Sequence, residues 1–265
     1  MKRLLIGIAC ALAAWSMNAR AEETRAWDFA GTRVAIEDTQ QGQRLTVRRG
    51  DAEPLSLEAW RLSVRDPAGA NLTGGTTPQL VVNGWSGGTQ CCYTVHLLDI
   101  GEHPHVIQSF DTGHSGSDPF TKFDDDEALE ITLPDWSFAN WPGSLANSPV
   151  PHVILHWDGR QYVPSPKLMR AGTMLYQMQE RRQPRSEEET ISAIFQDTLD
   201  MIYAGRWKAA RTLLKQLLPP TPDNKRLEQE FFDCKLPSSP FWPFVAGLNN
   251  VPAKPVAAGC PAKAG

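Results

Sequence analysis

The apolar residues of this chain follow two different periods, which change near Lys167. Before that point, short apolar or alternating runs are separated by Gly, Pro, Asp and Asn, a pattern that predicts an antiparallel β domain. Asp158-Gly159 stands between two such runs and predicts a two-residue hairpin turn. Strands are expected at 45–47, 60–64, 80–82, 93–98, 106–110, 130–133 and 153–157.

After Lys167 the apolar spacing becomes helical. Ser186 followed by Glu189 forms a capping box, and apolar residues then recur at steps of three and four up to Gly205. A second amphipathic helix begins near Trp207 and ends before Pro219-Pro220. The two helices predict an αα-hairpin that packs on the β domain, because a single such unit cannot bury its own apolar face. Beyond Phe241, Pro, Ala and Gly predict an extended tail.

Gln79 to Ser86 aligns with Glu130 to Ser137 at an offset of 51 residues. Each copy has a polar acceptor, aliphatic residues, a turn, and then Trp-Ser, and fixed periods near this length are typical of blade-like β units. The predicted fold class is therefore α+β, with an N-terminal antiparallel domain that resembles a partial propeller or a sandwich. The expected divisions are a signal peptide (1–21), the β domain (22–166, repeats near 73–88 and 124–139), a helical segment (167–235) and a Pro/Ala-rich tail (236–265).

The N-terminus has the composition of a secretory signal peptide. Lys2 and Arg3 precede an apolar run, and Ala19-Arg20-Ala21 is an A-x-A cleavage site. Lipid attachment at Cys10 is an alternative, although Gly7 stands where such sites favour leucine. No other stretch approaches the roughly 20 apolar residues of a membrane span. We therefore expect a periplasmic or secreted protein without a transmembrane anchor, cleaved near Ala21.

The charge balance disfavours nucleic acid as a partner. Cleavage removes Lys2, Arg3 and Arg20, so 26 basic residues become 23 against 30 acidic ones, and the formal charge moves from -4 to -7. The remaining Lys and Arg residues are scattered, and the clearest charge run is acidic. Polyphosphate binding requires clustered basic residues instead.

Four cysteines lie outside the leader, namely Cys91, Cys92, Cys234 and Cys260, and they allow three full pairings. Adjacent Cα atoms are about 3.8 Å apart across a trans peptide, below the usual disulfide range of about 4.4–6.8 Å. A Cys91–Cys92 bond therefore demands a local turn or a distorted peptide, for which the preceding Gly87-Gly88 offers freedom. We predict Cys91–Cys92 and Cys234–Cys260, with the cross-pairings left open.

The repeat region resembles bacterial secreted proteins with FG-GAP or VCBS-like repeats, over roughly Arg65 to Gly143. The stretch from Leu80 to Cys92 is also similar to an uncharacterised group of exported proteins with an SGG-x-x-CC signature. In FG-GAP proteins an acidic D-x-D-x-D-G loop often binds calcium. The resemblance implies calcium ligands at Asp124 and Asp126, although Ala128 and Leu129 replace the third carboxylate and the glycine. Calcium needs six or more oxygen ligands, and Glu130 can supply one of them. The alternative is a plain solvated acidic turn.

Two hypotheses for function follow. In the first, Trp85, Trp136 and Trp141 join the Cys91–Cys92 ring as a surface for a carbohydrate or cell-envelope component, unless these aromatic side chains only pack. In the second, Gly84-Trp85-Ser86-Gly87-Gly88 satisfies G-x-S-x-G, and a secreted hydrolase uses Ser86 with His152 and His156. A strand rather than a helix is expected after Ser86, so we favour a non-catalytic exported binding or envelope-interaction module.

Overall fold

The computed structural model describes residues 25–29, 31–65, 70–89, 91–171 and 186–260. The predicted signal peptide over 1–21 lies outside these ranges.

Within the described ranges the strands form three four-stranded antiparallel sheets, each built from four consecutive strands. We call the sheets blades 1, 2 and 3. Blade 1 contains β1 (Arg25–Phe29), β2 (Thr32–Thr39), β3 (Gly42–Arg49) and β4 (Leu55–Ala59). Blade 2 contains β5 (Arg61–Val64), β6 (Gln79–Trp85), β7 (Tyr93–Asp99) and β8 (His105–Gly113). Blade 3 contains β9 (Phe120–Thr121), β10 (Glu130–Pro134), β11 (His152–Trp157) and β12 (Tyr162–Pro164).

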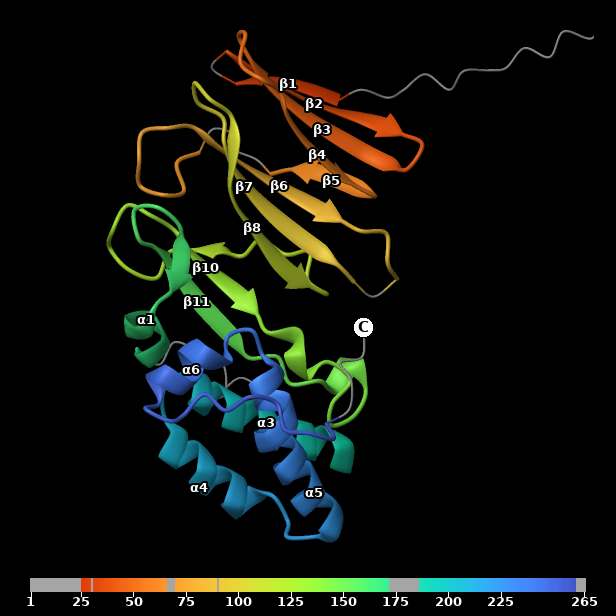
Figure 1. Ribbon diagram of the computed structural model, residues 1–265, viewed down its shortest axis with the longest axis vertical. Helices are drawn as coiled ribbons and strands as arrows, with labels where there is room; N and C mark the ends of the chain where they lie inside the picture. Colours follow the sequence, from red (N-terminus) through yellow and green to blue (C-terminus); the bar gives the residue numbers. More distant parts are fainter. Residues whose placement is uncertain (1–24, 30, 66–69, 90, 172–185, 261–265) are drawn as a thin grey trace, which may run out of the picture.

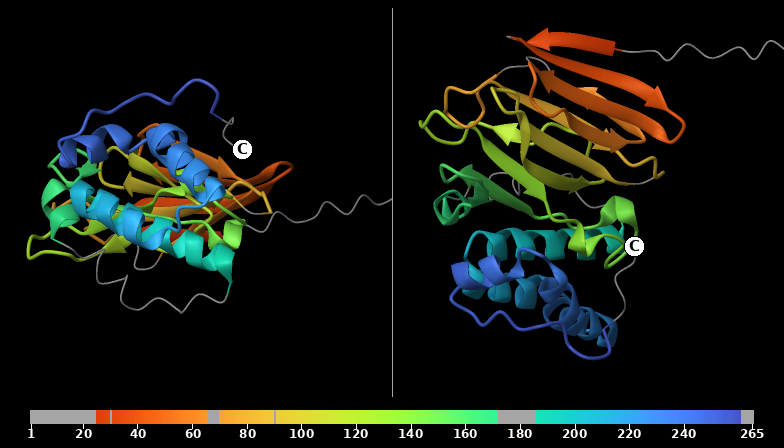
Figure 2. Two further views of the ribbon diagram at one scale, coloured as in Figure 1. Left: turned by 90° about the horizontal axis from the view of Figure 1, so that it is seen from below. Right: turned by 45° about the horizontal axis from the view of Figure 1, so that its top comes forward.

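The three blades stack face to face, and helices cover the outer face of blade 3 (Figures 1 and 2). Two apolar cores separate the layers. On β6, Leu80 and Val82 face blade 1, whereas Val81 belongs to the core shared with blade 3 and the helices. A strand buried on both faces needs apolar residues at every position, which explains the continuous apolar run there. The α+β prediction is confirmed, and the described strands do not close into a propeller.

The 51-residue repeat corresponds to one blade. β6 and β10 are the second strands of blades 2 and 3. Gln79 Oε1 accepts a hydrogen bond from the Leu72 amide at 2.8 Å, and the Glu130 carboxylate accepts one from the Phe123 amide at 2.6 Å. Both donors stand seven residues before the acceptor, and the acceptors are 2% and 1% exposed. The repeated acceptor thus fixes the loop that enters each second strand.

The helical layer comprises α1 (Pro166–Arg170), α3 (Glu187–Tyr203), α4 (Trp207–Leu217), α5 (Pro222–Glu230) and α6 (Trp242–Leu248), with a π-helical turn at Phe231–Lys235 and 3-10 turns η1 (Trp136–Phe138), η2 (Leu145–Asn147) and η4 (Leu236–Ser238). Ser186 Oγ accepts from the Glu189 amide at 3.1 Å, as the capping signal predicts. Gly205 has φ +74° just after α3, a conformation that favours glycine. Among the described residues, no helix combines the length and apolarity needed to span a bilayer.

The extended tail expected from residue 236 is wrong over its first part. η4 and α6 are helical, and Trp242, Val245 and Leu248 bury the inner face of α6. Apolar packing against the layer outweighs the local Pro and Gly content, and a proline in the first turn of a helix is tolerated. From Val251 on, the described chain has no regular secondary structure, and the Cys234–Cys260 disulfide ties it back.

A buried polar junction joins blade 3 to the helical layer. The Asp135 carboxylate follows β10, is 2% exposed, and accepts hydrogen bonds from the Tyr203 and Ser239 hydroxyl groups. Its other oxygen accepts from the Ser137 amide at 2.9 Å. Three donors therefore satisfy one buried carboxylate, as a charge inside a protein requires. Burial, followed by the Asp135 charge, raises the pKa of Tyr203 well above its ordinary value.

Candidate functional site

Several connecting segments gather at one end of the blade stack. The strands β2, β6, β8 and β10 run toward this end, where the arrowheads in Figure 1 point to the same side. The link between β4 and β5 also lies there, because β4 runs parallel to β2 within its meander. The loops that carry the sequence-predicted tryptophans and the adjacent cysteines are therefore neighbours in space.

At this end a hollow with a volume of about 880 Å³, which we call the central cleft, lies between blades 2 and 3. Cys91 and Cys92 line it from the loop after β6, and Trp136 lines it from the turn after β10. Phe241 contributes from the helical layer. The structure therefore brings together three of the predicted binding residues and adds an aromatic side chain from the segment predicted to be an extended tail.

Both predicted disulfides are present, Cys91–Cys92 and Cys234–Cys260. The Cys91–Cys92 peptide is cis, and the two Cα atoms lie 3.1 Å apart. Ser86 holds this ring in place, because its hydroxyl accepts from the Cys92 amide at 2.9 Å and its own amide donates to the Cys92 carbonyl at 3.1 Å. Ser86 thus has a structural contact in the loop that presents the disulfide to the cleft.

Trp136 is fixed by three contacts. Its Nε1 donates to the Thr112 carbonyl at 3.0 Å, and the His114 ring meets it edge-on with centroids 4.5 Å apart. Gly113 has φ +57°, and a Cβ atom at this position would overlap the indole ring. Only glycine leaves room for this approach, so the end of β8 is shaped around the Trp136 ring.

The other two predicted tryptophans do not face the central cleft. Trp85 props its own loop: its ring stacks on Tyr93 with centroids 6.4 Å apart, and its Nε1 donates to the Gly88 carbonyl. Trp141 is 4% exposed and stacks on Phe231 at 5.7 Å, inside the core below blade 3. For Trp141 the packing interpretation therefore replaces the ligand-binding one, because the helical layer covers it.

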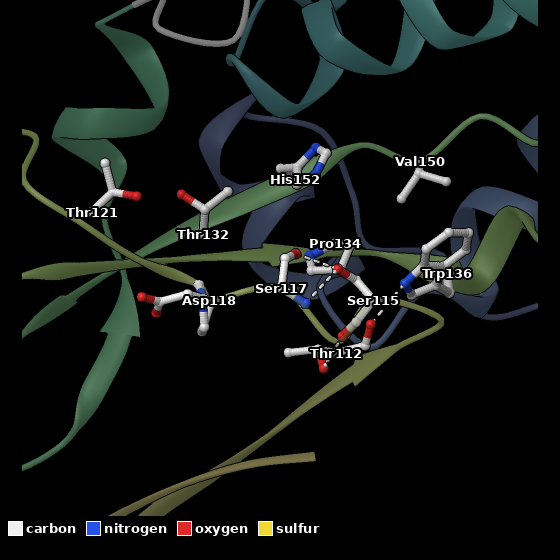
Figure 3. Close-up of a pocket in the computed structure, with 11 residues that line it drawn as sticks. Thr112, Ser115, Ser117, Asp118, Thr121, Thr132, Pro134, Trp136, Val150 and His152 are labelled. Carbon is white, nitrogen blue, oxygen red and sulfur yellow. Dashed lines mark hydrogen bonds between the residues drawn. The ribbon is translucent and has the colours of Figure 1, made fainter. Parts of the chain in front are cut away.

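A smaller hollow of about 330 Å³, the serine hollow, lies on the other side of Trp136 (Figure 3). Ser115 and Ser117 come from the segment between β8 and β9, and their hydroxyl groups are hydrogen-bonded to each other. His152 of β11 lies across the hollow from them. The walls are rich in hydroxyl groups.

The residues of the hydrolase hypothesis are not gathered in one hollow. Ser86 lies between the strands β6 and β7, whereas a nucleophile elbow leads from a strand into a helix. His152 lines the serine hollow, which Ser86 does not line. His156 lines neither the central cleft nor the serine hollow. The histidine that shares a hollow with Ser86 is His96, and burial lowers its pKa.

The acidic loop lies at the opposite end of blade 3, before β10. Ligand oxygens of Asp124, Asp126 and Glu130 all lie within 4.8 Å of one another, so these carboxylates form an acidic triad that could hold a metal ion. Burial raises the pKa of the Glu130 carboxyl, and the neighbouring Asp124 and Asp126 charges raise it further, against the lowering effect of the Phe123 amide. Lys167 approaches Asp124 at 3.7 Å and offsets part of the negative charge.

The chain matches no family model, and no similar protein is found among the curated proteins or the solved structures. The resemblance to FG-GAP and VCBS-like repeats therefore remains a prediction from the residues. Sequence reasoning overlooks Phe241 and Trp60 as surface aromatic residues at the cleft end. Only tertiary packing places them there, although the adjacent aromatic residues Phe241 and Trp242 in a Pro-rich segment are a local signal of a packed segment.

Proposed function

We propose that this protein is an exported, non-catalytic binding module that holds a carbohydrate in the central cleft. One observation carries the proposal: the cleft places the Cys91–Cys92 ring, Trp136 and Phe241 around one hollow. Its volume of about 880 Å³ falls within the range of small-molecule sites, about 300–1,000 Å³.

The lining suits a ligand with flat apolar faces and polar edges. Indole and phenyl faces and the disulfide ring offer apolar surface to the C–H face of a sugar ring. Gln108, Asp111 and Asn140 add amide and carboxylate groups that can meet hydroxyl groups. Among the described residues that line the cleft there is no Lys or Arg, so an anionic ligand would have no ion-pair partner.

Export is supported by the chemistry of the cysteines. Two disulfides account for all four cysteines outside the predicted leader, and disulfides persist in oxidising compartments. A glycan of the cell envelope or of the surroundings is therefore the ligand class that such a protein meets. The half-buried aromatic side chains of Trp136 and Phe241 and the polar groups of the cleft, rather than ion pairs, supply the binding energy.

The decisive experiment is a glycan-array screen with a peptidoglycan pull-down, comparing the parent with Trp136→Ala. We expect glycan binding by the parent and at least a tenfold loss in the variant, the order of one aromatic contact. Leu217→Ala is the matched control, since Leu217 is 48% exposed on α4, outside the cleft lining. Equal binding by Trp136→Ala, or ester hydrolysis that Ser86→Ala abolishes, would contradict the proposal.

We also propose that the acidic triad binds calcium, separately from the cleft. Calcium takes oxygen ligands at about 2.3–2.6 Å, so ligands across one ion are up to about 5 Å apart, which the triad spacing of 4.8 Å satisfies. Burial raises the pKa of the Glu130 carboxyl, the Asp124 and Asp126 charges raise it further, and a bound cation would offset these negative charges. Blade 2 provides the internal comparison, because Gln79 makes the equivalent hydrogen bond without a charge.

A further inference from the structure

Trp60 is the most exposed large apolar side chain among the described residues, at 56%. It lies in the link between blades 1 and 2, and the Gly87 backbone of the β6–β7 loop supports its ring. A Cβ atom at Gly87, where φ is +93°, would lie 2.9 Å from the indole Cγ atom. The side chain is thus held on one side and presented to solvent on the other. Exposure of the apolar ring to water is unfavourable, and packing in the core does not explain it.

Trp60 lines a hollow of about 380 Å³ at the seam between blades 1 and 2, which we call the Trp60 hollow. Gln41, Glu58 and Thr94 are among its other walls, so a ring face is surrounded by amide, carboxylate and hydroxyl groups. Glu58 is paired with Arg44, and burial keeps His96 on its neutral side by lowering its pKa. The hollow has the same chemistry as the central cleft, at the neighbouring seam.

The three hollows at this end of the stack share walls. Cys92 lines both the Trp60 hollow and the central cleft, and Trp136 lines both the central cleft and the serine hollow. The tryptophans also correspond through the repeat, since Trp85 lines the first seam and Trp136, 51 residues later, lines the second. Stacked sheets lie about 10 Å apart, so equivalent points of successive seams have about that spacing. Two of the hollows, the Trp60 hollow and the central cleft, thus lie at successive seams, each beside a tryptophan of the repeat.

We infer that the ligand is a neutral, extended oligosaccharide or polysaccharide that runs across these two hollows, with Trp60 as the stacking residue of a second subsite. This inference rests on the proposed function of the central cleft and extends it. The Cys91–Cys92 ring lies between the two hollows, and the oligosaccharide passes over it from one hollow to the next. A ligand of repeating units matches hollows at successive seams, because each unit can make similar contacts at the next seam.

The charge of the lining favours a neutral ligand over a polyanion. Among the described residues that line the three hollows there is neither Lys nor Arg. The nearby Arg61 guanidinium lies over the Trp85 ring, 5.6 Å from its centroid. An acidic polysaccharide would therefore lose hydration without gaining ion pairs, whereas hydroxyl-rich neutral units meet amide and hydroxyl groups.

Calorimetric titration of the full chain with chito- and cello-oligosaccharides, from disaccharide to hexasaccharide, tests the inference. We expect affinity to rise with chain length in one of the two series, because linked units bind intramolecularly after the first. Trp60→Ala should lower affinity for the hexasaccharide about tenfold and leave the disaccharide unchanged. Trp136→Ala should weaken both. Leu217→Ala should weaken neither, and binding should be insensitive to salt.

The outcomes separate the two proposals. The extended binding site is wrong if Trp136-dependent binding does not become tighter with oligosaccharide length, or if Trp60→Ala leaves the affinity unchanged at every length. Either result is still consistent with glycan binding in the central cleft. Failure of both series to bind the folded parent overturns both proposals. If the protein binds peptides of an unstructured library through Trp60 and binds no glycan, the hollows are a peptide site, and the proposal of a glycan ligand is wrong. Thermal unfolding of Trp60→Ala checks its fold, and Trp60→Tyr, which keeps a ring, should retain part of the affinity.

Discussion

Replacing Tyr203 by phenylalanine removes a single oxygen atom from the junction between blade 3 and the helical layer. The side chain is fully buried, and its hydroxyl donates to the Asp135 carboxylate. Phenylalanine fills nearly the same space, so no large cavity forms. The carboxylate keeps the Ser239 hydroxyl and the Ser137 amide as donors and loses one of three. A hydrogen bond to a charged group contributes about 1.5–3 kcal/mol to stability.

Tyr162→Phe is the matched control. Tyr162 is 3% exposed, and its hydroxyl donates at 3.1 Å to the Leu72 carbonyl, a neutral acceptor. Its loss should cost about 0.5–1.5 kcal/mol. Urea unfolding followed by tryptophan fluorescence gives both free energies, provided that the slope against urea is unchanged. A loss of about 2 kcal/mol also lowers the melting temperature by about 4–8 °C for a protein of this size.

The comparison isolates the charge of the acceptor, since the substitution and the burial are the same. Equal losses for the two tyrosines, within about 0.5 kcal/mol, would refute the view that an ionised Asp135 organises the junction. A double-mutant cycle with Ser239→Ala adds a second check. Both hydroxyl groups donate to the same oxygen, so their losses should not be additive.

Three further predictions concern calcium, pH and the cleft. Calcium should raise the melting temperature of the parent at neutral pH but not that of Glu130→Gln, which reproduces the uncharged acceptor of blade 2. At a calcium concentration of about 100 times the dissociation constant, the free energy of unfolding should rise by about 2.7 kcal/mol. Equal increases in both proteins would exclude the triad as the calcium site. Because the folded-state pKa of Tyr203 is raised, the tyrosine loses its proton at a lower pH in the unfolded chain than in the folded one. The free energy of unfolding should therefore be at its full value below about pH 10 and fall above it, by up to about 1.4 kcal/mol per pH unit, and it should fall less steeply in Tyr203→Phe. Urea unfolding at a series of alkaline pH values would contradict this if the free energy fell equally steeply in both proteins. Gly113→Ala should displace the Trp136 ring and lower glycan affinity at least tenfold while the far-ultraviolet circular dichroism is retained, and unchanged affinity would show that the ring position does not matter.

Local signals were sufficient where one segment determines its own conformation. Ser186 caps α3 as the capping signal predicts. The predicted hairpin is present and Gly159 has φ +97°, but Trp157 pairs with Tyr162, so four residues rather than the predicted two separate the strands. The Cys91–Cys92 pairing also follows from neighbours in the sequence. In each case the physical cause is a hydrogen bond, a backbone conformation or a covalent bond between residues a few positions apart. The sequence therefore predicts the helix cap and the disulfide correctly, and it predicts the position of the hairpin but not the length of its turn.

Features that depend on the meeting of distant segments could not be predicted in the same way. Trp141 and Trp136 both look like turn residues beside a repeat, yet α3 and the π-helical turn bury Trp141 and leave Trp136 at a cleft. Trp60 looks like the start of a strand and is exposed instead, because the link between two blades carries it. Exposure of an aromatic residue is decided by which layer covers it, and the sequence period contains no such information.

The two ends of the stack explain why three blades suffice without closure. On β2 of blade 1, buried residues alternate with polar ones such as Arg33 and Glu37, so the outer face of this blade tolerates water. On β11 of blade 3, Val153, Ile154 and Leu155 are all buried, and the helical layer covers the outer face. Stacked repeats need terminal units with a polar or covered outer face. Blade 1 also lacks the 51-residue signature because a terminal unit has one face to bury, and an alternating pattern replaces the doubly apolar strand of the inner units.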